Sequence, residues 1–79
     1  MSAGGKWIVE IHNDEVNTYA GVALIAHRLL GLPQDQGYEL AADLHHSESV
    51  ELTPRPGPEA ERLVADLQVF GLHATLREA

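Results

Sequence analysis

The chain has 79 residues, no cysteine, and a net charge of −7 from twelve acidic and five basic side chains. A domain this small buries only about 60% of its unfolded surface, which favours a shallow surface site over a deep catalytic cleft. Without cysteine there is no disulfide, thiolate nucleophile or Cys-ligated zinc, and a reducing cytoplasm is the expected compartment. The acidic surface argues against a nucleic-acid partner because it repels phosphate, and no apolar run reaches the roughly 20 residues that cross a membrane.

The first part of the chain predicts one strand and one helix. Apolar and polar side chains alternate over residues 7–12, as they do in a half-buried strand. The polar residues 13–15 end this strand, and Asn17 is a suitable N-cap for a helix over residues 18–30. Gly31 then suits the C-cap of that helix, because glycine adopts the left-handed conformation easily.

The rest of the chain predicts two more helices and two more strands. Pro33 suits the first turn of a helix that extends to about His46, and Gly37 inside it indicates close helix packing. Three prolines in residues 54–58 predict a stiff loop without regular structure. The remaining predicted elements are a strand at 49–53, a helix at 59–70 and a strand at 72–77.

The predicted order of elements is β-α-α-β-α-β. This order favours an α+β fold, a two-layer α/β sandwich with a three-stranded sheet and three helices. We expect residues 1–5 to form a flexible N-terminus and residues 6–79 to form a single domain.

Four side chains are expected to meet at one end of this fold. Asn13, Asp14 and Glu15 end the first strand, and His45 lies on the second predicted helix. An amide, two carboxylates and an imidazole supply the acceptors that a cation with several N–H donors needs. A free peptide α-amino group is such a cation, so these four residues are candidate substrate-binding residues.

Several short motifs occur along the chain in a recognisable order. They are Trp7-Ile8-Val9, residues 13–17, Leu44-His45 and the ending over residues 71–76. In the order and spacing of these motifs the chain resembles the ClpS family of bacterial N-end rule adaptors over nearly its whole length. The ending is most similar to that of actinobacterial members of this family. The resemblance implies an adaptor, not an enzyme, that binds an N-terminal Leu, Phe, Tyr or Trp and delivers the protein to a Clp ATPase for degradation.

The resemblance also implies which residues bind the substrate. Asn13, Asp14 and His45 would hold the α-amino group, whereas Glu15 stands where the family usually has a shorter residue. The family usually has Met at the positions of Tyr19 and Ala41, and the first Met excludes β-branched residues. We therefore expect that large N-terminal residues still bind here, with a changed order of preference. The hydrophobic pocket implied by position consists of Asn17, Tyr19, Val22, Ala41, Leu44 and Leu72.

The resemblance implies partners as well. These are N-degron proteins or peptides and the N-domain of a ClpA-like or ClpC-like ATPase, and we expect a monomer without cofactor or metal.

The chain departs from the family at Glu48-Ser49-Val50, where a Gly-Lys-Ala run is usual, and at Pro58 and Leu63, where a docking acid and base are expected. The long N-terminal arm that passes the substrate on is also not apparent. The alternative function is therefore a ClpS-like module that binds N-terminal residues or a protein partner without delivery to Clp.

The sequence also bears on other classes of function. Asn13-Asp14-Glu15 also suits a simple turn and helix cap, and His12 with His45 and acids is a conceivable zinc site. An enzyme would need a nucleophile placed beside Asp14 and His45, and the sequence offers none in a known motif. The C-terminal domain of the ribosomal stalk protein shares the expected fold but uses a lysine-rich helix, and this chain has a single Lys.

Overall fold

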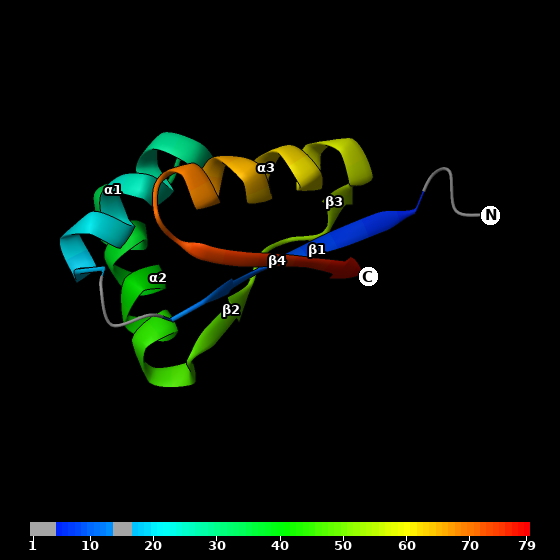
Figure 1. Ribbon diagram of the computed structural model, residues 1–79. Coiled ribbons are helices and arrows are strands. Elements are labelled where there is room, and N and C mark those ends of the chain that lie inside the picture. The colour runs from blue at the N-terminus through cyan, green and yellow to red at the C-terminus, as the bar shows by residue number, and fades with distance from the viewer. Residues whose placement is uncertain (1–4, 14–16) are drawn as a thin grey trace.

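A computed structural model describes residues 5–13 and 17–79 of the chain. These residues form two layers, with helices on one face of an antiparallel sheet (Figure 1). The α+β sandwich expected from the sequence is confirmed. The order of elements is β1 (Lys6–His12), α1 (Tyr19–Leu30), α2 (Gln34–Ser47), β2 (Ser49–Glu51), β3 (Arg55–Pro56), α3 (Gly57–Val69) and β4 (His73–Glu78).

β1 is the central strand of the sheet. One of its edges pairs with β4 along nearly its whole length, from Trp7 opposite Glu78 to His12 opposite His73. Its other edge pairs with β2 near the end of β1, at Glu10 and beyond, and with β3 near its start. The segment between β2 and β3 stays close to β1, because the Leu52 N–H donates to the Val9 carbonyl at 2.9 Å.

The described sheet has four strands, one more than the sequence predicted. The extra strand is β3, in the proline-rich segment for which we expected no regular structure, and this expectation was wrong. Proline lacks an N–H and interrupts a ladder of hydrogen bonds, but an edge strand tolerates it because one side needs no partner. Pro54 therefore divides one edge of the sheet into two short strands.

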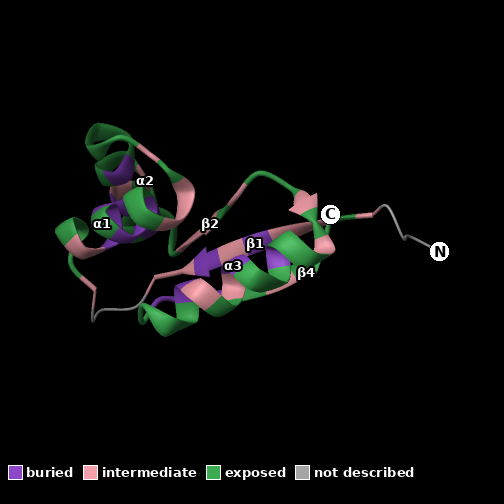
Figure 2. Cartoon of the chain, turned by 90° about the horizontal axis from the view of Figure 1, so that it is seen from above, coloured by how far each residue is buried: buried purple, intermediate pink, exposed green. Residues whose placement is uncertain are grey.

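The hydrophobic core lies between the sheet and the helices, and Figure 2 shows its buried residues on the facing surfaces. Val9 and Ile11 alternate with Glu10 and His12, so β1 turns its apolar face toward the helices. α3 runs along β1 and β4, whereas α1 and α2 pack as a pair at one end of the sheet (Figures 1 and 2). The helices contribute these buried residues to the core cluster: Val22, Ile25, Ala41, Leu44, Ala60, Leu63 and Leu67.

Two glycines account for how α1 and α2 are joined and packed. Gly31 ends α1 in the left-handed conformation with a φ of 69°, as expected of a C-cap glycine. At Gly37 of α2, an added Cβ would lie 3.0 Å from the backbone carbonyl oxygen of Ala23 on α1. The close packing predicted from Gly37 is therefore present, and it sets the distance between the two helices.

The N-terminus of α1 differs from the prediction. The N-cap is Thr18, whose hydroxyl accepts a hydrogen bond from the Gly21 N–H at 3.0 Å. Asn17, the expected cap, instead donates from its side-chain amide to the Gly71 carbonyl at 3.1 Å. Both residue types are good caps, and the tertiary contact with the loop before β4 decides between them.

Glu48 ends α2 in a conformation that is costly for a residue with a side chain. Its φ is 67°, in the left-handed region, where a non-glycine residue loses about 1–2 kcal/mol. Glu48→Gly is therefore expected to raise the free energy of unfolding by about 1 kcal/mol, measured by urea denaturation. The matched variant Glu48→Ala keeps a Cβ and should give no such gain. Equal stabilisation by both variants would mean that the side chain, not the backbone, is the source of the cost.

Candidate functional site

A cavity of about 320 Å³ opens between the start of α1, the middle of α2 and the end of β1. It brings together seven of the residues that the sequence singled out for substrate binding, together with one that it did not. The lining residues are Asn13, Asn17, Thr18, Tyr19, Val22, Ala41, Leu44 and His45. They come from two parts of the chain, residues 13–22 and 41–45, which meet because α2 packs against α1 and the Asn13 N–H donates to the Glu48 carbonyl.

The floor of the cavity is apolar. Val22, Ala41 and Leu44 are buried in the core cluster and also line the cavity. Ala41 and Leu44 lie three residues apart on α2, so both side chains face the same side of that helix. An apolar group that enters the cavity therefore meets the core of the protein directly.

Asn13 stands at the mouth of the cavity, immediately after β1. Its backbone N–H donates to the Glu48 carbonyl at 2.7 Å, which ties the end of β1 to the end of α2. Within the described ranges, the Asn13 side-chain amide makes no hydrogen bond. It is half-buried and keeps both a carbonyl acceptor and an NH₂ donor available to a ligand.

His45 stands across the mouth, on the exposed side of α2. Its ring lies 5.6 Å from the ring of Tyr19, with the two planes tilted by 60°, and 5.8 Å from the ring of His46. In the part of the chain that the structure describes, its nitrogens make no hydrogen bond. A neutral imidazole in this position presents one nitrogen as an acceptor.

The remaining predicted site residues have different places. Leu72 lies in the loop between α3 and β4, is buried in the core cluster, and does not line the cavity. Thr18 lines the cavity although the sequence analysis did not name it, and its position directly before α1 is the signal that would have found it. Asp14 and Glu15 lie outside the described residues, and so do residues 1–4 of the flexible N-terminus expected over residues 1–5.

The described residues show no cluster that would hold a metal by three ligands. No group of three or more His, Asp or Glu side chains with suitable placement occurs in residues 5–13 and 17–79. His12 and His45, which the sequence left open as a zinc pair, contact different partners: His12 contacts His73 on the sheet, and His45 contacts Tyr19. Neither shares a ring contact with the other.

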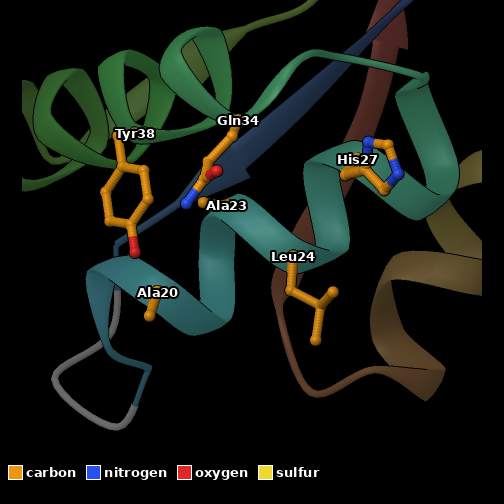
Figure 3. A pocket seen from close by; sticks show the side chains of 6 residues that line it. All are labelled: Ala20, Ala23, Leu24, His27, Gln34 and Tyr38. Atoms are coloured by element: carbon orange, nitrogen blue, oxygen red, sulfur yellow. The ribbon is translucent and has the colours of Figure 1, made fainter.

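A second cavity, of about 380 Å³, lies on the outer side of the α1–α2 pair. In Figure 3, Gln34 and Tyr38 extend from α2 across toward Ala23 and Ala20 of α1. Its remaining polar group is His27, whose Nδ1 is already paired with the Leu32 carbonyl at 3.0 Å. The lining of this cavity contains no carboxylate, and none of the residues predicted to bind substrate contributes to it.

Taken together, fold and cavity define a small α+β domain whose cavity has an apolar floor and a polar mouth. No described helix combines the length and apolarity needed to cross a bilayer.

No family model matches the chain. It is 31% identical over 72 residues to the ATP-dependent Clp protease adapter protein ClpS of Streptomyces coelicolor, covering 91% of this chain and 75% of that protein. It is also 31% identical over 72 residues to the adapter protein ClpS of Streptomyces avermitilis, covering 91% of this chain and 69% of that protein.

The chain belongs to the ClpS family of Clp protease adaptors. The resemblance identified from the sequence is thereby confirmed, and so is the expectation of an adaptor in place of an enzyme. A solved structure shares the fold: Agrobacterium tumefaciens ClpS2 bound to L-phenylalaninamide superposes with a TM-score of 0.85. At 16% identity, the match covers 95% of this chain and 98% of that one.

Proposed function

We propose that this protein binds N-degrons: it captures the free α-amino group and the side chain of an N-terminal Leu, Phe, Tyr or Trp in the cavity beside Asn13 and His45. The observation that carries the proposal is the joint placement, above an apolar floor, of two polar side chains that make no hydrogen bond to any other described residue. The solved structure of ClpS2 contains L-phenylalaninamide, a ligand with a free α-amino group and a Phe side chain, and this supports the proposal.

The polar mouth suits an ammonium group. A peptide ammonium has three N–H donors, and the Asn13 carbonyl oxygen and a neutral His45 nitrogen supply two acceptors. Asp14, which precedes the described part of α1 in sequence, is proposed as the counter-charge, and Glu15 as an accessory acceptor. Each charge-assisted hydrogen bond contributes about 1.5–3 kcal/mol.

The apolar floor suits the side chain of the same residue. Burial of a Leu or Phe side chain against Val22, Ala41 and Leu44 contributes roughly 1.5–3 kcal/mol. Loss of translational and rotational freedom on association costs at least about 4 kcal/mol. With three such hydrogen bonds, the upper values leave about 8 kcal/mol, which corresponds to a dissociation constant on the order of micromolar at the tightest.

Blocking the amine tests the proposal. A Phe-led peptide and its N-acetylated twin differ only in the charge and donors of the α-amino group, so isothermal titration should show binding of the free peptide and at least a hundredfold loss for the acetylated one. That loss corresponds to about 2.7 kcal/mol, within the range of one or two charge-assisted hydrogen bonds. Equal binding of the two peptides would refute amine capture.

Binding should also depend on pH. A protonated imidazole loses its acceptor and repels an ammonium. Affinity for a Phe-led peptide is therefore expected to be several-fold lower in acidic than in neutral solution. The described titratable groups that contact His45 are Tyr19 and His46, so the His46→Gln variant is the control. A profile that is flat in both proteins would exclude His45 as an acceptor.

Delivery of the bound protein to a Clp ATPase is the second part of the proposed function, with the N-domain of a ClpA-like or ClpC-like ATPase as the partner of a monomeric adaptor. One observation favours the alternative of binding without delivery. Leu63, at a position where the family has a docking base, is only 7% exposed and belongs to the core. A pull-down on immobilised Phe-led peptide, with each candidate ATPase added, separates the two: retention of an ATPase supports delivery, and retention of the adaptor alone supports the alternative.

A further inference from the structure

Two histidines meet on the open face of the sheet, which the helices do not cover. His12 of β1 and His73 of β4 are directly opposite each other in the antiparallel ladder, so both side chains point to the same side. Their ring centroids are 4.8 Å apart and their planes are tilted by 36°. The peptide-binding cavity does not use either of them.

The distance between the rings matches that of two imidazoles on one metal ion. With a metal–nitrogen bond of about 2.0–2.1 Å and a ring radius of about 1.1 Å, the centroids are about 4.5 Å apart at a bond angle of 90°. They are about 5.2 Å apart at the tetrahedral angle by the same geometry. The observed separation lies between these values.

The hydrogen bonding of the pair leaves nitrogen lone pairs available. His12 Nε2 lies 2.7 Å from the Thr75 hydroxyl. When Nε2–H donates to that hydroxyl, His12 is held as the tautomer whose Nδ1 carries the lone pair, which is how a neighbouring group commonly orients a metal-binding histidine. The His73 nitrogens make no hydrogen bond within the part of the chain that is described.

The surrounding charge favours a cation. Glu10 and Glu51 occupy the next row on the same face, and the one guanidinium beside them, that of Arg77, pairs with both. Two carboxylates against one cation leave this patch acidic, and the whole chain carries a net charge of −7. A positively charged ion is therefore attracted to the face that carries the histidine pair.

We propose that His12 and His73 form a two-imidazole site for a divalent transition-metal ion, with the remaining positions of the ion filled by water or by a group of another molecule. Imidazole ligands suit Cu²⁺, Ni²⁺ and Zn²⁺, and divalent affinities rise from Co²⁺ through Ni²⁺ to Cu²⁺. An ion held there joins the end of β1, which leads into Asn13, to the start of β4.

The test uses Cu²⁺ and Ni²⁺ on the full chain without a histidine tag. Titration calorimetry should give one saturable site with Cu²⁺ bound more tightly than Ni²⁺, and electron paramagnetic resonance of the Cu²⁺ complex should show two coordinated imidazole nitrogens. His73→Gln and His12→Gln should each weaken Ni²⁺ binding at least tenfold and leave at most one imidazole nitrogen on Cu²⁺. Excess Ni²⁺ should raise the melting temperature of the parent protein but not of either variant.

The control removes a histidine from the second His–His ring contact among the described residues, that between His45 and His46. His46 contacts His45 on α2 at a ring distance of 5.8 Å, and His46→Gln should leave metal binding unchanged. The proposal is overturned if the parent protein shows no saturable binding. It is equally overturned if His46→Gln abolishes binding while His12→Gln and His73→Gln retain it, because the site would then lie on α2.

Discussion

Replacing His45 with Ala is expected to weaken binding of a Phe-led peptide by more than tenfold. His45 supplies one of the two described acceptors at the mouth of the cavity, and a hydrogen bond to a charged group contributes about 1.5–3 kcal/mol. A tenfold change in affinity corresponds to about 1.4 kcal/mol. The measurement is a fluorescence anisotropy titration of the labelled peptide at pH 7.5. Asn13→Ala should weaken binding by a similar factor for the same reason, and so should Asp14→Ala.

The neighbouring histidine provides the matched control. His46 is on the same helix and is also exposed, but it does not line the cavity. His46→Ala should therefore change the affinity by less than twofold. Both histidine variants are expected to keep the melting temperature of the parent, because neither side chain belongs to the core. Unchanged affinity in His45→Ala, with a normal melting temperature, would remove His45 from the site.

Filling the cavity with Ala41→Leu is expected to lower affinity for Phe-led and Trp-led peptides by more than tenfold. Ala41 is 3% exposed and lies on the apolar floor, so a larger side chain occupies the space that the ligand needs. Overpacking costs typically about 1–3 kcal/mol, which a domain with roughly 4–12 kcal/mol of stability tolerates. Affinity is measured by titration, and folding is checked by circular dichroism at the same temperature.

The second cavity supplies the comparison for this variant. Ala20→Leu places the same enlargement on α1, at the edge of the outer groove that Tyr38 and Gln34 border (Figure 3). It should leave peptide affinity unchanged. The reverse pattern, with binding lost in Ala20→Leu and kept in Ala41→Leu, would move the peptide site to the outer groove.

Most helices and strands of this fold follow from local sequence signals. Alternation in β1, the apolar spacing in α1 and α3, and the glycine at position 31 each reflect a preference that a few neighbouring residues express. The strand Arg55–Pro56 does not, because it exists only through pairing with Lys6 and Trp7 nearly fifty residues earlier. The prolines of residues 54–58 predicted a loop from local sequence, whereas pairing with the edge of β1 makes Arg55–Pro56 a short strand.

The site shows the same division between local and distant effects. The sequence pointed to Asn13, Tyr19 and His45, and the cavity contains all three. Leu72 was expected in the pocket by its position in the predicted last strand, but its side chain belongs to the core cluster and it does not line the cavity. The contact between His12 and His73 was also not predicted, because it depends on the register of two strands at opposite ends of the chain.

Chemical-shift mapping is the most direct test of the central claim, that the cavity beside Asn13 and His45 binds a free amine with its hydrophobic side chain. Isotope-labelled protein is titrated with L-phenylalaninamide and, separately, with N-acetyl-L-phenylalaninamide. The account predicts saturable shifts at the Asn13 side-chain amide, the His45 ring and the Val22 methyl groups with the free amine, and none with the acetylated compound. Shifts confined to Leu24, Gln34 and Tyr38 around the outer groove, or equal shifts with both compounds, would contradict it.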